Sequence, residues 1–462
     1  MSESLRPEEL NWIGVRFLDR LGRVFRLDGE YYRAIYPHRV AYARHLLSLP
    51  TIHRLMDAGL LVKSRVSSLE VEGYGMVIHH DKAAYRLPSS TWGRLQLRDA
   101  AESYLQLNLA LLREGLALID GHSANFAQLG KAKPTWIDFG SIIELNGQNE
   151  FPSEVGLKEF RTAFLNPLRF LAKSNDFIRL TRVILEKGGV SDRELALLTG
   201  HPSNLIEGVL NRGELRACEF AVEREEMLKE MLGAIPSEFM SVNTTWSAYQ
   251  PVDKLMPVGY EQSGRRAGKI LELLTRLQPR RVVDLASNAG FFSFMAARQG
   301  ADVCAIELDE QAIDILYATA KASAESLNMS CGCFDLLVGF PEVFNQADLV
   351  LALALTHHLT LGQGFPFSYV AEMLASYSTE ALITEFMPNG LGIKGNVVPD
   401  PLPSWYTVEN LMACLRRYFA SVDVIPYEME PGHSPRTMVL CVGRRAKTDE
   451  RLHQDRPDRL HT

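Results

Sequence analysis

Residues 280–307 read RRVVDLASNAGFFSFMAARQGADVCAIE: an apolar run, a turn that ends in glycine, a helix-like stretch and a second apolar run. Runs that are apolar at successive positions are typical of strands buried on both faces of a parallel sheet. The alternation continues downstream, with helices expected at 310–327 and 407–419 and strands at 329–334, 348–355 and 381–386. This pattern predicts an α/β fold with a doubly wound, Rossmann-like, mostly parallel sheet.

The end of the chain carries two further strand-like runs, at 421–429 and 436–443. The short turn PGHSP separates them, which predicts a hairpin and therefore one antiparallel strand at an edge of the sheet. From Arg444 the sequence RRAKTDERLHQDRPDRLHT is nearly devoid of apolar residues. We expect 444–462 to be a disordered tail, because it cannot bury enough surface to offset the entropy of ordering.

The composition is that of an ordinary globular protein of 462 residues with a formal charge of -7. The charge gives no global reason to bind nucleic acid. The N-terminus lacks the pattern of a signal peptide and no stretch is long and apolar enough for a membrane span, so we expect a cytoplasmic protein. The six cysteines are thinly spread, and no disulfide framework is expected. Cys331 and Cys333 form a C-x-C without a second ligand pair nearby, so we expect no metal site there.

The turn after the first strand, from Asp284 to Gly290, lies where open parallel sheets bind a nucleoside cofactor. Ala286 and Asn288 stand where a dinucleotide fingerprint carries glycines, which favours a cofactor without phosphates, and Gly290 keeps the helix-packing role. Glu307 ends the second strand, where an acid accepts hydrogen bonds from ribose hydroxyls. Asp335 follows the third strand and could receive an adenine amino group.

Taken together, these acids and strands resemble the class I S-adenosyl-L-methionine-dependent methyltransferases over about Tyr260 to Gly443. The resemblance implies S-adenosyl-L-methionine as the cofactor. The positions that it implies for cofactor binding are Asp284, Ala286, Ser287, Asn288, Gly290, Phe291, Glu307, Leu308 and Asp335.

At the end of the fourth strand, His357 and His358 lie where the methyl group and the acceptor would meet. Histidine titrates near neutrality, so His358, or else His357, could take a proton from an attacking hydroxyl. A purely structural histidine beneath the cofactor is the alternative. Glu385, which ends the fifth strand, could orient the histidine or the acceptor, or could be a solvated strand end. No metal is required, because much of the rate can come from orientation.

The first half carries a second motif, with Asp120, then Asn125 five residues later, then Asp138 in a D-F-G triplet. This order resembles a protein kinase catalytic loop and its metal-binding aspartate, and it implies a role for these residues with ATP and magnesium. No glycine-rich loop precedes the motif, and the nearest strand offers Arg33 in place of the kinase lysine. Because arginine replaces that lysine poorly, we expect a kinase-like scaffold without phosphotransfer.

Most of the chain after about Val24 resembles bacterial two-part methyltransferases related to the nodulation protein NoeA. The stretches that carry this resemblance are YRLPSSTWGRLQLRDAAESYLQLNLALL, PTWIDFGSI, LALTHHL and ITEFMP. The resemblance implies a glycan or another small hydroxylated acceptor. The expected domains are a degenerate kinase-like α+β domain at 1–220, a helical linker at 221–259 and a methyltransferase domain at 260–443. Trp246 and Tyr249 of the linker could form an aromatic lid over the sulfonium, or could pack the linker onto the methyltransferase domain, which is the use that we favour. A bifunctional kinase and methyltransferase and a noncatalytic cofactor-binding scaffold remain as alternatives. Oligomeric state is not predicted.

Overall fold

The structure is a computed structural model that describes residues 4–14, 19–83, 85, 87–129, 133–145, 154–173, 188–200, 221–240, 244–338, 347–391, 401–429 and 434–445. Contacts group the described residues into two compact units. The first unit holds residues up to Leu255 together with Asn288–Asp335, and the second holds Met256–Ser287 with most of the chain after Asn345. None of the described helices is both long and apolar enough to cross a membrane.

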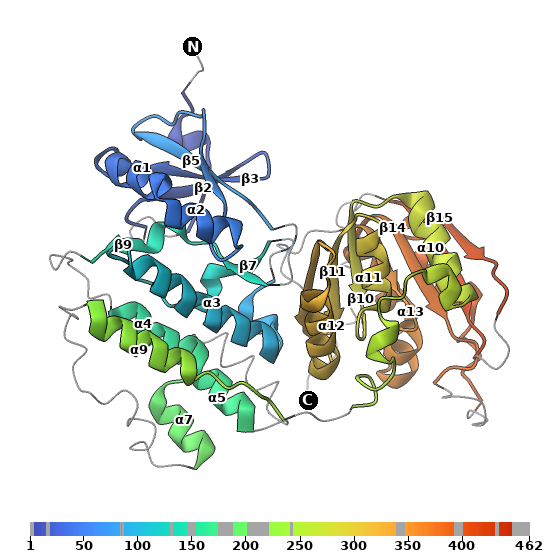
Figure 1. The fold of residues 1–462 in the computed structure, drawn as a ribbon. Coiled ribbons are helices and arrows are strands. Elements are labelled where there is room, and N and C mark those ends of the chain that lie inside the picture. Colours follow the sequence, from blue (N-terminus) through green and yellow to red (C-terminus); the bar gives the residue numbers. More distant parts are fainter. Residues whose placement is uncertain are drawn as a thin grey trace, which may run out of the picture. The chain divides into compact units, whose positions relative to one another are not determined.

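The first unit begins with a five-stranded antiparallel sheet in the order β1-β2-β3-β5-β4 (Figure 1). Its strands are β1 (Asn11–Ile13), β2 (Gly22–Leu27), β3 (Glu30–Ile35), β4 (Ser64–Val66) and β5 (Met76–His80). Two helices follow β3, α1 (Val40–Ser48) and α2 (Pro50–Asp57).

Both faces of this sheet are buried, because side chains alternate along each strand. Ile35 and Ile78 belong to the large core that also contains residues of α1 and α2. Phe25 and Ala34 belong to a smaller core on the other face. Arg33 lies in the buried second half of β3, two residues before Ile35 and therefore on the same face of the strand.

The middle of the first unit is mainly helical and carries two short two-stranded sheets, with the D-F-G triplet in the connection between them. Its helices are α3 (Arg94–Leu112), α4 (Glu154–Phe160), α5 (Asn166–Lys173), α7 (Asp192–Thr199) and α9 (Ala221–Gly233). The paired strands are β6 (Leu116–Leu118) with β9 (Ile142–Glu144) and β7 (Phe126–Gln128) with β8 (Pro134–Trp136). The helix expected from residue 221 is therefore confirmed.

The first unit also contains part of the predicted Rossmann-like pattern. It comprises α11 (Phe291–Arg298), β11 (Asp302–Glu307), α12 (Glu310–Ala322) and β12 (Met329–Cys333). Helix α12 packs on α3 through polar contacts: Arg94 pairs with Asp314 at 3.0 Å, and the Tyr317 hydroxyl donates to Asp99 at 2.7 Å. These side chains are buried, so their hydrogen bonds also fix the contact between the two helices.

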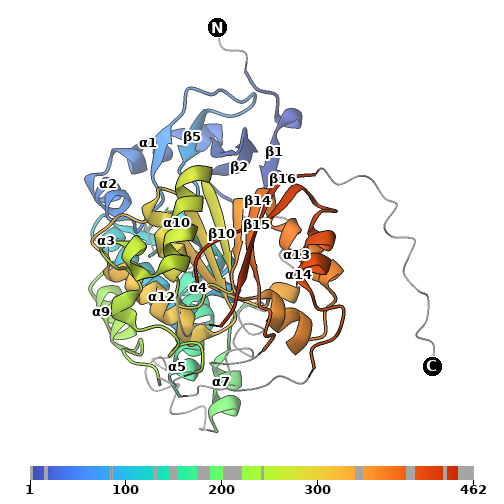
Figure 2. The same cartoon turned by 90° about the vertical axis from the view of Figure 1, so that its right-hand side faces the viewer.

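The second unit contains the other strands of that pattern and three helices. Its elements are α10 (Arg265–Leu277), β10 (Arg281–Leu285), β13 (Ala347–Ala352), α13 (Phe367–Ser376), β14 (Ser378–Phe386), α14 (Val408–Leu415), β15 (Phe419–Ile425) and β16 (Thr437–Arg444). Figure 2 shows α13 and α14 together on one side of these strands and α10 on the other.

Seven strands form the large sheet, in the order β12-β11-β10-β13-β14-β16-β15. Parallel pairs join β11 to β12, β10 to β13 and β13 to β14, which confirms a mixed α/β fold with a largely parallel sheet. One expectation is corrected: the antiparallel strand is not at the edge. Strand β16 turns back from β15 and inserts between β14 and β15, pairing antiparallel with both, so the edge strand is β15.

Several sequence expectations are not decided by this architecture. The domain limits and the kinase-like arrangement of the first 220 residues stay predictions. The tail from residue 446 and Cys218 lie outside the described residues. The five cysteines within them are free thiols, four of them buried.

Candidate functional site

The loop between β10 and α11 has a left-handed backbone at three alternate positions. The φ angles are +56° at Ala286, +52° at Asn288 and +89° at Gly290. Glycine adopts this conformation at little cost and asparagine tolerates it, so the strain lies mainly at Ala286, and such strain is concentrated at functional sites. The two positions at which a dinucleotide fingerprint would carry glycines, Ala286 and Asn288, therefore still have the positive φ that glycine adopts easily.

Gly290 has a packing role as well, as the sequence predicted. A Cβ atom at this position would lie 2.6 Å from Cδ1 of Leu316 in α12. The absence of a side chain lets the start of α11 approach α12 closely.

Glu307, the last residue of β11, is tied to this loop by its carboxylate. Oε2 accepts a hydrogen bond from the backbone N–H of Asn288 at 2.8 Å, and Oε1 accepts from the N–H groups of Leu308 and Asp309 at 2.7 and 3.1 Å. The side chain is 8% exposed, and this burial raises the pKa of Glu307 while the backbone donors oppose the shift. A carboxylate held in one orientation suits an acceptor of hydroxyl hydrogen bonds.

The remaining residues predicted to bind the cofactor lie on the same stretch of chain or at the following strand end. Asp284, in β10, and Ser287 are buried. Phe291 is the first residue of α11, and Leu308, directly after Glu307, is exposed. Asp335 follows β12 and is half-buried.

The segment expected as a lid contacts the loop directly. Nδ2 of Asn288 donates to the backbone carbonyl of Trp246 at 2.8 Å. The Trp246 and Tyr249 rings lie 6.3 Å apart, and both are exposed. The hydrogen bond therefore ties the segment that carries the exposed aromatic pair to this loop, and a role for the pair as a lid stays a prediction.

In the second unit, the two candidate bases follow β13. The His357 and His358 rings are 4.0 Å apart, His357 is 6% exposed and His358 is half-buried. Burial lowers the pKa of His357 to about 3, with a further decrease from the charges of His358 and Arg436, and burial also lowers the pKa of His358. Both imidazoles are therefore neutral at physiological pH. Ala354, just before them, has a strained φ of +52°.

Glu385, at the end of β14, is a fully buried anion between two arginines. Its carboxylate accepts two hydrogen bonds from Arg266, each of 2.7 Å, and it contacts Nη1 of Arg436 at 3.3 Å. Its backbone carbonyl accepts a hydrogen bond from the Thr356 hydroxyl at 2.6 Å, next to the histidines. Burial alone would raise the pKa of Glu385, but the guanidinium groups outweigh it and lower the pKa. Glu385 is thus a permanent counter-ion.

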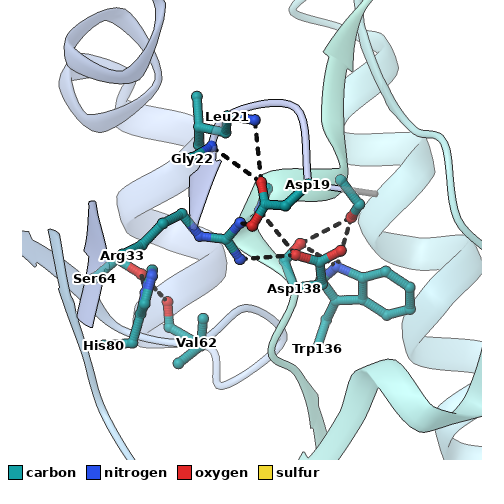
Figure 3. Close-up of polar contacts among 11 residues, drawn as sticks. Asp19, Leu21, Gly22, Arg33, Val62, Ser64, His80, Trp136 and Asp138 are labelled. Atoms are coloured by element: carbon teal, nitrogen blue, oxygen red, sulfur yellow. Dashed lines mark hydrogen bonds and ion pairs between the residues drawn. The ribbon is translucent and has the colours of Figure 1, made fainter. Parts of the chain in front are cut away.

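In the first unit, Arg33 of β3 occupies the centre of the predicted kinase-like motif. Figure 3 shows its guanidinium between the carboxylates of Asp19 and Asp138. It donates to Asp138 at 2.9 Å, and the N–H of Gly140 donates to the same carboxylate oxygen at 3.1 Å. Arg33 is 3% exposed, so a buried cation already holds Asp138, the residue that was predicted to correspond to the magnesium-binding aspartate of kinases.

The other two residues of the motif lie nearby in sequence. Asp120 follows β6, and Asn125 ends a single 3-10 turn before β7. Burial raises the pKa of Asp120 to about 6, and a hydrogen bond with the carboxyl group of Glu159 adds to the shift. Within the described residues, no group of three or more histidine, cysteine or acidic side chains could hold a metal ion.

The sequence did not identify four residues that build these sites: Asp19, Glu159, Arg266 and Arg436. All four contact residues far away in the chain, and none belongs to a motif. The adjacent basic residues Arg265 and Arg266 at the start of an amphipathic helix were a visible signal, because a charge in the first turn on the buried side needs a partner.

Comparison with known proteins confirms the predicted resemblance to the NoeA-related proteins. The chain is 25% identical over 412 residues to the nodulation protein NoeA of Rhizobium meliloti (strain 1021), a match that covers 80% of this chain and 84% of that protein. No family model matches the chain.

Solved structures similar to part of the chain include methyltransferases. The bifunctional kinase-methyltransferase WbdD is 20% identical with a TM-score of 0.30, and the match covers 42% of this chain and 46% of WbdD, less than half of its length. The N-terminal domain of EvdMO1, solved in the presence of SAH and D-fucose, has 16% identity, a TM-score of 0.30 and coverages of 39% and 83%. ChlM, a magnesium protoporphyrin IX methyltransferase from Synechocystis PCC 6803 with bound SAH, has 17% identity, a TM-score of 0.29 and coverages of 41% and 89%.

Proposed function

We propose that the chain is an S-adenosyl-L-methionine-dependent methyltransferase that methylates a hydroxyl oxygen of a sugar, a glycan or another small metabolite. The observation that carries the proposal is the strained loop after β10, with left-handed Ala286 and Asn288 and with the Asn288 N–H bound to Glu307. The strand order reverses at β10, and open α/β sheets bind nucleoside ligands at such a switch point.

The residues of this loop fit a cofactor with a ribose and without phosphates. We assign the carboxyl group of Glu307, held by backbone N–H groups, to the ribose hydroxyls, and Asp335, which follows the next strand, to the adenine amino group. Ala286 and Asn288 carry side chains where a pyrophosphate would need bare backbone. When bound, S-adenosyl-L-methionine supplies a methyl group that is electrophilic because it is attached to a sulfonium sulfur.

The acceptor side of the reaction falls to the histidines after β13. In the proposed step, the acceptor oxygen bonds to the methyl carbon while the C–S bond breaks with its electron pair on sulfur. The hydroxyl proton passes to His358, which leaves a methyl ether and S-adenosylhomocysteine. His358 is the better base of the two, because His357 is more deeply buried and its pKa of about 3 makes it a weak proton acceptor.

For the first unit we propose a supporting role in acceptor binding and no phosphotransfer. Magnesium would have to displace Arg33 from Asp138, and Arg33 is a buried arginine with two carboxylate partners. Removing such a charge from its partners is strongly unfavourable. This pairing disfavours the bifunctional alternative.

The first test is thermal unfolding of the full chain with S-adenosylhomocysteine, with ATP and magnesium, and with both. A ligand at about 100 times its Kd stabilises the protein by about 2.7 kcal/mol, which moves a cooperative transition visibly. We expect a shift with S-adenosylhomocysteine alone. The absence of that shift would contradict the proposal, and a shift with ATP and magnesium would support the bifunctional alternative.

The second test is incorporation of a radioactive methyl group into a cell extract. We expect incorporation by the wild type and none by Asp284→Ala, while the exposed Asp253→Asn serves as the matched control. Saturable cofactor binding without methyl product in any extract would favour the scaffold alternative.

A further inference from the structure

We propose that the methyl acceptor carries an anionic group, a phosphate or a carboxylate, and that Arg436 binds it beside the end of β14. The inference rests on the proposed function, because it names the class of acceptor for the same site. It is drawn from the charges of Arg266, Glu385 and Arg436, which belong to the second unit.

The charge of Glu385 is already balanced without Arg436. Nε and Nη2 of Arg266 both donate to the Glu385 carboxylate at 2.7 Å, which is the bidentate arrangement that guanidinium and carboxylate prefer. A pair of this geometry is electrically neutral. Any further cation that approaches it adds a net positive charge.

Arg436 is that further cation. Its one contact with the pair is between Nη1 and Oε2 of Glu385, at 3.3 Å, longer than the two bonds from Arg266. Among the described residues, Glu385 is the only carboxylate within ion-pair distance of Arg436. The side chain is 16% exposed, so water can neutralise little of its charge. A largely buried net charge is unfavourable unless an anion completes the site.

The surroundings of Arg436 indicate that this anion belongs to the acceptor. Arg436 contacts the carboxylate of Glu385, and the backbone carbonyl of Glu385 accepts the hydrogen bond of Thr356, the residue directly before His357. Nδ1 of His357 is buried and has no hydrogen-bond partner among the described residues. An unsatisfied buried nitrogen next to a surplus guanidinium matches a ligand with several oxygens. The neighbouring Ala354 is strained, which is common where a backbone is shaped around a ligand.

The experiment measures binding of small anions by the full chain saturated with S-adenosylhomocysteine. Thermal unfolding is followed while inorganic phosphate, or acetate in a second series, replaces chloride at constant ionic strength. The variants are Arg436→Gln, Arg436→Lys and the control Arg276→Gln, which removes an exposed charge from the far end of α10. The Lys variant keeps the positive charge. If it retains part of the anion binding that the Gln variant loses, the loss is caused by the missing charge and not by a defect in folding.

We expect phosphate or acetate to stabilise the wild type, and the more effective anion identifies the group on the acceptor. Arg436→Gln should weaken the apparent affinity by about tenfold or more, Arg436→Lys should retain part of it, and Arg276→Gln should match the wild type. Stabilisation that is absent, or equal in all four proteins, would overturn the inference. A chain that binds S-adenosylhomocysteine but no anion refutes only this inference, whereas a chain that does not bind S-adenosylhomocysteine refutes the proposed function itself.

Discussion

The loop Ala286–Gly290 and the Arg33 centre both lack residues that the corresponding family patterns carry, and they differ in what replaces them. In the loop, two glycines are absent, yet Ala286 and Asn288 still take the left-handed backbone that glycines would provide. In the Arg33 centre, the sequence lacks the expected kinase lysine, and Arg33, which was predicted to stand in its place, binds Asp138 directly.

The two substitutions have different chemical consequences. A glycine contributes a backbone shape, and another residue can supply the same shape at the cost of strain. A lysine or a metal-binding aspartate contributes a free charged group, and a partner that neutralises the group removes its function. We therefore expect the loop to bind a ligand. We expect the Arg33 centre to stabilise the fold and to bind no ligand.

The largest effect should follow from Arg33→Ala, which tests the stabilising role of the Arg33 centre. The change leaves Asp19 and Asp138 without their buried cation, and we expect the free energy of unfolding to fall by about 3 kcal/mol in urea titrations. Added magnesium should restore part of the stability of the variant and none of the wild type, because the ion can then reach Asp138.

The matched control for this prediction is Arg65→Gln. Arg65 pairs with Asp81 at 3.3 Å, but both side chains are exposed, so the loss should stay below about 1 kcal/mol. Equal losses in the two variants would mean that the Arg33 centre is no more than a surface ion pair.

A smaller effect is expected from Glu307→Gln, which tests whether the loop still binds a ligand. The substitution removes the negative charge. It also replaces one carboxylate oxygen by an NH2 group, which cannot accept the hydrogen bond from the backbone N–H of Asn288 or Leu308. Affinity for S-adenosylhomocysteine, measured by calorimetric titration, should fall by about thirtyfold, or about 2 kcal/mol. Glu380→Gln, at an exposed position of β14, should bind like the wild type. Unchanged affinity in Glu307→Gln would contradict the assignment of the loop.

The sequence predicted the large sheet well because its signals are local. Apolar runs such as 302–307 and 347–352 define strands by composition, and their register follows from crossover helices of ordinary length. The insertion of β16 between β14 and β15 was not predictable in this way. A hairpin specifies that two strands pair, but it does not specify which of them meets the neighbouring strand.

The candidate site residues were predictable where their signal is local, as for the strands, and not where they depend on contacts between distant parts of the chain. Glu307 ends β11 and the histidines follow β13, so their positions at strand ends were enough to single them out in the sequence. The partners Arg266 and Arg436 are 119 and 51 residues from Glu385 in the chain, and only folding brings them together. The arrangement of these charges at the end of β14 therefore could not be inferred from the sequence.

The next effect concerns the pH dependence of stability. It tests whether Asp120 has a raised pKa in the folded chain or is an ordinary ionised carboxylate that could act as a catalytic base. The pKa of Asp120 is raised to about 6 in the folded chain, above its ordinary value, so the folded state holds more protons between about pH 4 and pH 6. Stability must therefore fall as pH rises through this window. Asp120→Asn should remove that dependence and stabilise the chain at pH 7 by about 1 kcal/mol, since partial exposure screens the interaction.

Urea unfolding at about pH 5 and pH 7 measures this difference directly. The exposed Asp253→Asn is the control and should follow the wild type at both pH values. A wild type that gains stability from pH 5 to pH 7, with the same gain in Asp120→Asn, would show that Asp120 is an ordinary ionised carboxylate, as an active kinase loop requires.

The smallest effect returns to the strained loop. Ala286→Gly relieves a left-handed φ of +56°, worth about 1 kcal/mol, while glycine adds entropy to the unfolded chain worth about half of that. The net change should be a gain of about 0.5 kcal/mol in the free energy of unfolding. Ala289→Gly is the matched comparison, because Ala289 is fully buried in the same loop and does not have a positive φ; it should lose about 1 kcal/mol. Opposite signs for two identical substitutions three positions apart would establish that the strain lies in the backbone. If Ala286→Gly also weakens binding of S-adenosylhomocysteine, the strain is part of the binding site, because a freer loop must then be ordered by the ligand.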